Sequence, residues 1–274
     1  MFMVCLVVGA AAAHADTRPL RVVSAGGDLT EIVYALGAGD RLVGVDSTSR
    51  HPGETQKKAQ IGYVRRVSAE GVLSLKPDLV LGANDLGPPP AVEQLRATGV
   101  RVAIAPEGDS PDGVLDKILF VGRHLGLDDE ARRLAGEIRE EMTRAIETAA
   151  KSSRGRKVIF VLSVGDSGVL VGGENTAADA IIRLAGGENA ARGFEGYKPM
   201  SRESILQAQP EVVLMMKNRQ GGHRSTDRIL DRPEFSMTPA VASGSLVTMD
   251  GLLLLGFGPR TPKAVAELSS AINR

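Results

Sequence analysis

"SAEGVLSLKPDLVL" (residues 68–81) returns along the chain as "SRESILQAQPEVVL" (residues 201–214). Each copy places glutamate two residues after a serine, leucine at the sixth position and proline at the tenth, followed by an acid and a run ending in Val-Leu. The serine is suited to cap a short helix, the proline ends it, and the apolar run is typical of a buried strand. Two such units, 133 positions apart (68 to 201), predict two similar lobes rather than a short-period solenoid.

Apolar runs of strand length recur on both sides of these units, and helix-period segments lie between most of them. This alternation predicts an α/β fold made of two Rossmann-like lobes, each with a mostly parallel central sheet. The predicted strands are residues 21–24, 42–45, 79–81, 100–104, 158–162, 212–215 and 246–249.

The longest helical pattern, "DEARRLAGEIREEMTRAIETAAK" (residues 129–151), lies between the two lobes. Its apolar residues recur near period four, and charged residues cover its other faces. A helix of this length reaches about 34 Å, which is enough to join two lobes and to limit hinge motion. The predicted division is a signal peptide at 1–15, an N-terminal lobe at 16–124, an interdomain helix at 125–152 and a C-terminal lobe at 153–274.

The first fifteen residues form an apolar run that ends in Ala13-His14-Ala15, an A-x-A-like cleavage site. We therefore expect export to a periplasm of the Gram-negative type. The sole cysteine, Cys5, lies in this segment, so no disulfide is expected in the exported chain. No second apolar run of about twenty residues follows, so no stable membrane insertion is expected. Lys plus Arg and Asp plus Glu both number 33, which argues against a nucleic-acid partner.

Two α/β lobes joined by one long helix, each with a Ser-x-Glu helix before "KPDLVL" or "QPEVVL", resemble a known cluster of periplasmic binding proteins. These proteins serve ABC importers of haem, siderophores and cobalamin. "GYVRRVSAEGVLSLKPDLVLG", "GPPPAVEQLRATGVRV", "GENTAADAIIRLAGG", "GYKPMSRESIL" and "LGFGPRTPKAVAEL" are similar to its haem (hemin) branch. The resemblance covers nearly the whole exported chain. It implies a monomer that captures ferric haem (ferric protoporphyrin IX) in the inter-lobe cleft and delivers it to an inner-membrane permease dimer.

The resemblance assigns Tyr63 as the axial ligand of the haem iron and Arg65 as a hydrogen-bond donor to its phenolate. The chemistry of the residues agrees, since Fe(III) is a hard cation, phenolate is a hard anionic donor, and tyrosine is a known protein ligand of haem. Free tyrosine has a pKa of about 10, so ligation at neutral pH needs the metal and a nearby cation to favour the anion. Arg65 is that cation in this interpretation.

Other residues of the haem-branch motifs are expected near the ligand. Tyr197 and Lys198 of "GYKP" are expected at a haem edge or a propionate, or Tyr197 packs under its own loop. Arg260 of "GFGPR" suits a propionate because a guanidinium binds a carboxylate in bidentate fashion, and Phe257 suits the porphyrin face. Some haem-binding relatives carry a histidine in the loop after the first strand of the second lobe, where this chain has Val164, which favours one haem over two. A solvated surface role is expected for Arg66, Arg219 and Arg224.

Glu70 and Glu203 occupy matching positions in the two repeated helices. In the wider family, such glutamates, one in each lobe, dock onto arginines of the two permease subunits. A two-lobed protein that meets a dimeric transporter needs one anchor per lobe. Each glutamate also suits the first turn of a helix, where it stabilises the helix dipole by about half a kilocalorie per mole.

Binding of a ferric siderophore or of cobalamin is the nearest alternative, because the fold and the docking glutamates would be the same. Cobalamin-type pockets of this cluster favour aromatic lining, whereas this chain has no tryptophan and only 3% aromatic residues. Zinc or manganese capture would need a cluster of histidines and carboxylates, and the chain after Ala15 holds only the dispersed His51, His124 and His223. We do not expect an enzyme, because no phosphate loop, nucleophile elbow or cysteine nucleophile is complete.

Overall fold

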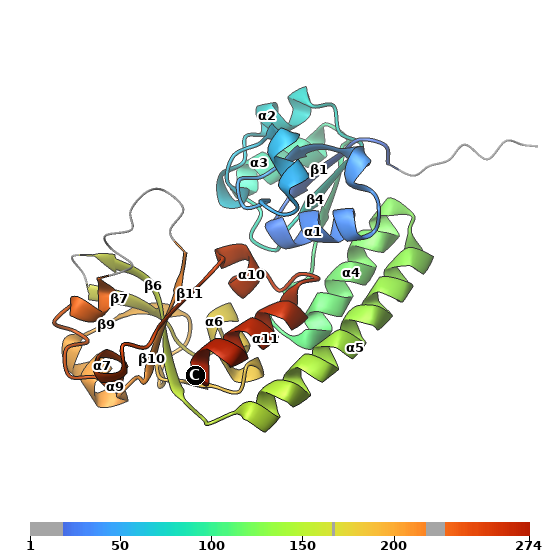
Figure 1. Ribbon diagram of the computed structural model, residues 1–274. Helices are drawn as coiled ribbons and strands as arrows, with labels where there is room; N and C mark the ends of the chain where they lie inside the picture. The colour runs from blue at the N-terminus through green and yellow to red at the C-terminus, as the bar shows by residue number, and fades with distance from the viewer. Residues whose placement is uncertain (1–18, 166–167, 218–227) are drawn as a thin grey trace, which may run out of the picture.

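The computed structural model describes residues 19–165, 168–217 and 228–274. Two α/β lobes lie side by side, joined along one edge by long helices (Figure 1). The first lobe holds a fully parallel sheet in the order β3-β2-β1-β4-β5. Its strands are β1 (Val22–Ala25), β2 (Leu42–Val45), β3 (Ala59–Gln60), β4 (Leu79–Gly82) and β5 (Arg101–Ile104). Its helices are α1 (Gly27–Ala35), η1 (Gly39–Arg41), η2 (Gly53–Lys57), η3 (Val64–Arg66), α2 (Ala69–Ser74) and α3 (Pro89–Ala97).

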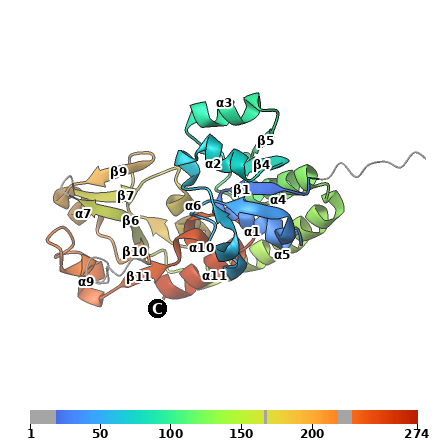
Figure 2. The ribbon, with the colours of Figure 1, turned by 90° about the horizontal axis from the view of Figure 1, so that it is seen from above.

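The second lobe holds a mixed sheet in the order β11-β10-β6-β7-β9, with β8 paired to β6. Figure 2 shows β6, β7 and β9 in this lobe, away from β1 and β4 of the other. The strands are β6 (Lys157–Gly165), β7 (Gly168–Gly172), β8 (Glu188–Asn189), β9 (Tyr197–Met200), β10 (Val212–Met216) and β11 (Leu246–Met249). The helices are α6 (Ala177–Leu184), α7 (Arg202–Ala208), η4 (Ile229–Asp231), α9 (Pro239–Ser243), α10 (Gly251–Leu255) and α11 (Thr261–Ile272).

The repeated sequence unit forms the same structure in both lobes. Ser68 accepts a hydrogen bond from the amide of Gly71 at 3.2 Å and caps α2, and Ser201 accepts one from the amide of Ser204 at 3.2 Å and caps α7. Each helix is followed by a strand, β4 or β10, that pairs in parallel with the first strand of its lobe, β1 or β6. The predicted internal repeat is therefore confirmed.

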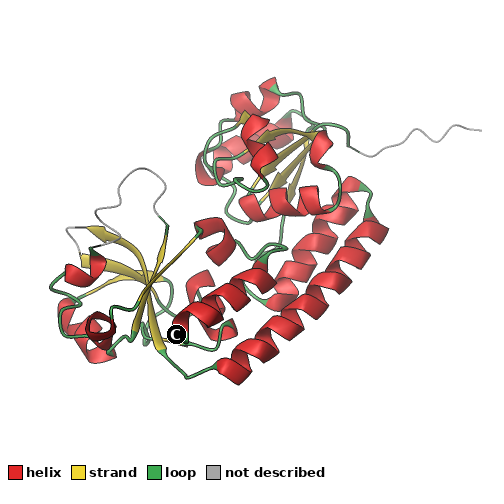
Figure 3. Cartoon of the chain, viewed as in Figure 1, coloured by secondary structure: helices red, strands yellow, loops and turns green. Residues whose placement is uncertain are grey.

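Two long helices connect the lobes, α4 (Pro111–Leu125) and α5 (Asp128–Ser152). They pack against each other over their length, and α11 of the second lobe packs along α5 (Figure 3). Helix α5 has 25 residues, so it is about 37 Å long. The predicted α/β class with a long connecting helix is confirmed. The exact boundaries between lobes and helix remain a prediction, and the signal peptide predicted at 1–15 lies outside the described residues.

A single cluster of buried apolar side chains runs through both lobes. It includes Leu29 and Ile32 of α1, Met142 of α5, Phe160 of β6 and Leu254 of α10. Because the same cluster is shared, part of the inter-lobe contact is made by core packing as well as by the connecting helix. Among the described helices, none is both long and apolar enough to cross a membrane.

Candidate functional site

Tyr63 lies at the start of η3, in the turn between β3 and α2 of the first lobe. Gly62 before it has a φ of 93°, a conformation that favours glycine, and this turns the chain so that Tyr63 is 42% exposed. The loop after β4 braces the turn, because the amide of Val67 donates to the carbonyl of Gly87 at 2.9 Å and the amide of Gly87 donates to the carbonyl of Val64 at 3.0 Å. The phenol is thus presented outward from a fixed turn.

Arg65 lies beside Tyr63 and forms an ion pair with Asp85, a residue of the same bracing loop. Its Nε donates to Asp85 Oδ2 at 2.7 Å. The hydrogen bond to Asp85 is the first cause that raises the pKa of Arg65, and the electrostatic interactions with Tyr63 and Tyr197 raise it further. Arg65 of the first lobe is therefore within electrostatic reach of tyrosines from both lobes.

Tyr197 begins β9 in the second lobe and is 39% exposed. Its ring meets Phe160 edge to face, with 6.4 Å between the centroids. Burial of the hydroxyl is the main cause that raises the pKa of Tyr197, and the charge of Asp109 from the first lobe adds to it. Hydrogen bonds with the Ala178 backbone and the Thr176 side chain oppose the rise, and Arg65 opposes it to a smaller extent. Tyr197 is therefore a neutral phenol at physiological pH. We call Tyr63, Arg65, Asp85, Asp109 and Tyr197 the inter-lobe face.

Lys198 follows Tyr197 and is exposed, with its ammonium 5.8 Å from the ring centroid of Phe194. The structure thus brings Tyr63, Arg65 and Tyr197 to one face, with Lys198 adjacent in sequence. Val164 was expected in a loop after the first strand of the second lobe, but it lies within β6 and is half-buried.

Arg260 and Phe257 do not join this face. Arg260 forms a two-point ion pair with Glu31 of α1, and that carboxylate is buried. Phe257 is 1% exposed inside the shared core. In this structure both side chains are committed to partners within the protein, so the expectations that Arg260 binds a propionate and that Phe257 packs on a porphyrin gain no support from it.

Glu70 and Glu203 both lie exposed in the first turns of the paired helices α2 and α7. Hydrogen bonds from its own backbone amide and from the Ser201 hydroxyl lower the pKa of Glu203, so its negative charge persists at neutral pH. Arg66 is exposed as expected, whereas Arg219, Arg224 and His223 lie outside the described residues.

Asp85 and Asp109 belong to the face but were not singled out from the sequence. Each follows a strand of the parallel sheet, β4 or β5. Ligand sites of open α/β sheets lie beyond the carboxyl ends of the strands, so the position of these two residues after predicted strands could have marked them as candidate site residues.

Two small depressions, one on the first lobe and one along the connecting helices, have volumes of about 210 Å³ and about 170 Å³. The first is lined by residues around α3 and the second by residues of α4 and α5, so neither includes the inter-lobe face. Both are smaller than the roughly 300–1,000 Å³ typical of ligand pockets. Within the described ranges, no group of three or more His, Cys, Asp or Glu residues is arranged to hold a metal ion.

Two α/β lobes, a long connecting helix and an exposed polar face between the lobes define a solute-binding protein of the helix-linked class. The model of the family described as "Periplasmic binding protein" matches Val22 to Leu252, and the chain belongs to this family. The chain is therefore an extracytoplasmic solute-binding protein, and the expectation that it is not an enzyme is confirmed.

Solved structures with the same fold include two with substantial sequence identity. "Periplasmic heme-binding protein RhuT from Roseiflexus sp. RS-1 in apo form" is 40% identical, with a TM-score of 0.88, and the match covers 92% of this chain and 97% of that one. "Periplasmic heme-binding protein BhuT in complex with two hemes" is 38% identical, with the same TM-score and coverage. The predicted resemblance to this group of binding proteins is confirmed.

Curated relatives are more distant in sequence. The "Uncharacterized ABC transporter substrate-binding lipoprotein YvrC" of Bacillus subtilis (strain 168) is 28% identical over 93% of this chain and 80% of its own length. The "Vitamin B12-binding protein" of Pectobacterium carotovorum subsp. carotovorum (strain PC1) is 28% identical over 93% of this chain and 88% of its own.

Proposed function

We propose that this protein captures ferric haem between its lobes, with the Tyr63 phenolate as the iron ligand. The observation that carries the proposal is an exposed phenol beside a guanidinium on a face shared by both lobes. Similarity of 38–40% to proteins named as heme-binding supports it.

The residues of the face fit the chemistry of this ligand. Ferric iron favours a hard anionic oxygen, which Tyr63 supplies on binding the metal, and the Arg65 guanidinium beside it is a hydrogen-bond donor to that oxygen. Tyr197 stays protonated and suits hydrogen bonding to a ligand oxygen from the second lobe. Lys198 is exposed on the second lobe and is the proposed propionate partner there. Burial of the macrocycle between the lobes supplies most of the affinity.

A single haem is the stoichiometry that we propose. Val164 provides no imidazole on the second lobe, so Tyr63 is the one strong iron ligand of the face. The structure of BhuT is named as a complex with two hemes, so the number of haems bound is where this protein is proposed to differ from it. A hemin titration that ends at two equivalents would contradict the single-haem proposal while leaving haem binding intact.

Replacement of Tyr63 tests the ligand assignment. Hemin titration of the purified protein should give a Soret band and a high-spin charge-transfer band, and Tyr63→Ala should shift or abolish both because the iron loses its anionic ligand. Tyr34→Phe is the matched control, since Tyr34 is a first-lobe tyrosine on α1 whose hydroxyl is buried without a hydrogen-bond partner in the described chain. An unchanged spectrum and affinity in Tyr63→Ala would overturn the proposal.

Cobalamin is the second candidate, because curated relatives such as the Pectobacterium protein are named as vitamin B12-binding. The same purified protein distinguishes the two ligands. Cyanocobalamin should not displace hemin from the protein. Displacement of hemin by an equimolar amount of cyanocobalamin would favour the alternative.

Delivery completes the proposal. The protein acts as an exported monomer, with residues 1–15 removed as a signal peptide, and Glu70 and Glu203 dock onto the two membrane subunits of an ABC importer. The relative YvrC, named as an ABC transporter substrate-binding lipoprotein, supports this role. Release of haem then follows separation of the lobes by the importer.

A further inference from the structure

We propose that residues 256–260 ("GFGPR"), together with Asp28 and Glu31 of α1 and Lys117 of α4, form an inter-lobe latch. We define the latch by these residues. Arg260 and Lys117 are positioning residues in this proposal: they fix the separation of Tyr63 and Tyr197 without touching the ligand. The geometry of the latch stands independently of the ligand, and only its effect on haem release rests on the proposed function.

The first contact of the latch joins α1 of the first lobe to the start of α11 in the second. Arg260 Nε donates to Glu31 Oε2 at 3.0 Å, and its Nη2 donates to Oε1 of the same carboxylate. The side chain of Glu31 is 5% exposed and that of Arg260 is 24% exposed. A two-point contact of this kind fixes both distance and orientation. Separation of the lobes would break both hydrogen bonds between this carboxylate and Arg260.

The second contact passes through Lys117. Its Nζ donates to Asp28 Oδ2 at 2.7 Å within the first lobe and to the carbonyl of Gly256 in the second lobe at 3.2 Å. The side chain of Lys117 is 7% exposed. A buried ammonium needs its partners, because an unpaired charge in the interior is strongly unfavourable. Lys117 therefore holds the backbone of the "GFGPR" segment against the first lobe.

The backbone of the segment is fitted closely to α1. A Cβ on Gly258 would lie 3.4 Å from the Cα of Asp28 and 3.4 Å from Glu31 Oε2. A Cβ on Gly27 would lie 2.6 Å from the Cδ1 of Leu252 in α10. Phe257, between these contacts, is buried in the core cluster shared by the lobes. The contact is therefore closely packed around both ion pairs.

A rigid inter-lobe arrangement follows from these contacts. The connecting helices hold the lobes along one edge, and the latch holds them at a second place, next to α1. Rotation of one lobe against the other must break the Arg260–Glu31 pair, the Lys117 contact with Gly256, or both. We infer that the inter-lobe face is preformed before the ligand arrives, and that the latch resists its opening.

A pair of spin labels, one in each lobe, measures the distance between the lobes and its spread. After Cys5→Ser the chain has no cysteine, so Arg96→Cys on α3 and Gln207→Cys on α7 place one label in each lobe at exposed helical positions. The inter-label distance distribution of the ligand-free protein should be narrow. Arg260→Ala should broaden it, and Glu31→Gln, which keeps an acceptor oxygen for the guanidinium, should broaden it less. Lys263→Ala is the matched control, because its contact with Glu267 lies within α11.

The kinetic consequence is measured on the same variants. Arg260→Ala should speed hemin dissociation about tenfold, equivalent to ~1.4 kcal/mol, while the Soret maximum stays unchanged because Tyr63 is intact. Equal distance distributions in the parent, Arg260→Ala and Glu31→Gln would overturn the latch. If Arg260→Ala does not fold, equal distributions in the parent and Glu31→Gln would overturn it. Because the distance measurement uses no ligand, failure of hemin to bind would count against the proposed function and not against the latch.

Discussion

The Arg65 guanidinium has five N–H donors, and among the described residues only its Nε is engaged, by Asp85. The remaining donors are free to serve a phenolate or a propionate. The Arg65 side chain is 64% exposed and that of Asp85 is 35% exposed, so this pair adds about 0–1 kcal/mol to stability at most. Its effect on the site is therefore one of orientation: Asp85 holds Arg65 next to Tyr63.

Substitution of Asp85 should weaken haem capture without touching the ligand. Asp85→Ala frees Arg65 to rotate into solvent, so hemin affinity should fall about fivefold, equivalent to ~1 kcal/mol, which is the usual contribution of one hydrogen bond. Asp85→Asn keeps an acceptor oxygen for Nε and should lose less. Hemin titration by absorbance measures both variants.

The control repeats the Asp85→Ala substitution in a protein that already carries Arg65→Ala. If Asp85 acts through Arg65, the additional substitution Asp85→Ala should change nothing once Arg65 is gone. The same loss of affinity in both backgrounds would show that Asp85 acts in some other way.

Site residues that share one turn could be predicted from the sequence, and residues whose partners are remote could not. Tyr63 and Arg65 are two positions apart, so their proximity follows from local geometry. Arg260 pairs with Glu31, which is 229 positions away, and this tertiary contact redirects a guanidinium that suits a propionate equally well. Burial of Phe257 likewise depends on packing between lobes.

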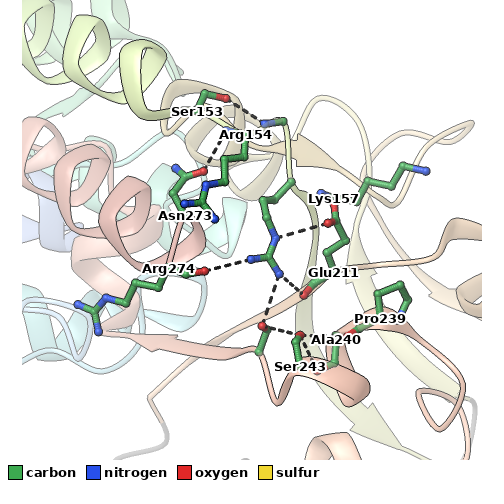
Figure 4. A network of polar contacts seen from close by, with 12 residues as sticks. Ser153, Arg154, Lys157, Glu211, Pro239, Ala240, Ser243, Asn273 and Arg274 are labelled. Atoms are coloured by element: carbon green, nitrogen blue, oxygen red, sulfur yellow. Dashed lines mark hydrogen bonds and ion pairs between the residues drawn. The ribbon is translucent and has the colours of Figure 1, made fainter.

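The acidic residue that follows the repeated proline, Asp78 or Glu211, has the same structural role in each lobe. The Asp78 carboxylate accepts the amide of Arg21, at the start of β1, at 2.9 Å, and the Glu211 carboxylate accepts the amide of Lys157, at the start of β6, at 2.8 Å. Figure 4 shows Glu211 beside Lys157 in a network that reaches the C-terminal Arg274. In each lobe, the acid before the second repeated element, β4 or β10, therefore binds the start of the strand with which that element pairs, β1 or β6. The repeated sequence thus favours the pairing of these two strands.

All seven predicted strands are present, because parallel strands buried on both faces give continuous apolar runs. The four additional strands carry weaker signals. β3 and β8 have two residues each, and β9 contains Pro199 and is mostly exposed. β7 and β9 are antiparallel to their neighbours, so the alternation of strands and helices does not predict them.

Helix α4 contains a histidine that makes stability depend on pH. The ring of His124 lies 4.5 Å from that of Phe120, and burial lowers the pKa of His124 from its usual 6.5, with Arg101 and Arg123 adding to the effect. Below pH 6.5 the unfolded chain binds this proton before the folded protein does, so stability falls as pH falls towards the lower folded pKa. Each unit of depression corresponds to about 1.4 kcal/mol.

The test compares stability at two pH values. In His124→Asn, the loss in free energy of unfolding between pH 7.5 and pH 5.5 should be smaller than in the parent, as measured by urea denaturation. The pKa of His51 is also lowered, first by burial and then by Arg260, so His51→Asn serves as the second variant and should leave the contribution of His124 in place. An identical acid-side loss in the parent and in His124→Asn would contradict the assignment.

In the proposed delivery role, the whole molecule acts as a spacer that carries two charged anchors. Glu70 is on the first lobe and Glu203 on the second, at matching places in α2 and α7. Helix α5, the shared core and the latch all restrict the relative position of the lobes. A fixed separation matters for docking, because two anchors engage a dimeric partner together only when their spacing suits it.

Charge reversal at the anchors should therefore separate capture from transport. Glu70→Lys combined with Glu203→Lys should leave hemin affinity and the Soret band unchanged, because neither residue belongs to the inter-lobe face, while haem uptake by cells that carry the cognate importer should be lost. Each single reversal should reduce uptake less than the pair does, since one anchor remains. The neutral variants Glu70→Gln and Glu203→Gln distinguish loss of attraction from added repulsion, because they remove the negative charge without placing a cation against the partner. Full uptake in the double reversal would show that docking does not depend on these two carboxylates.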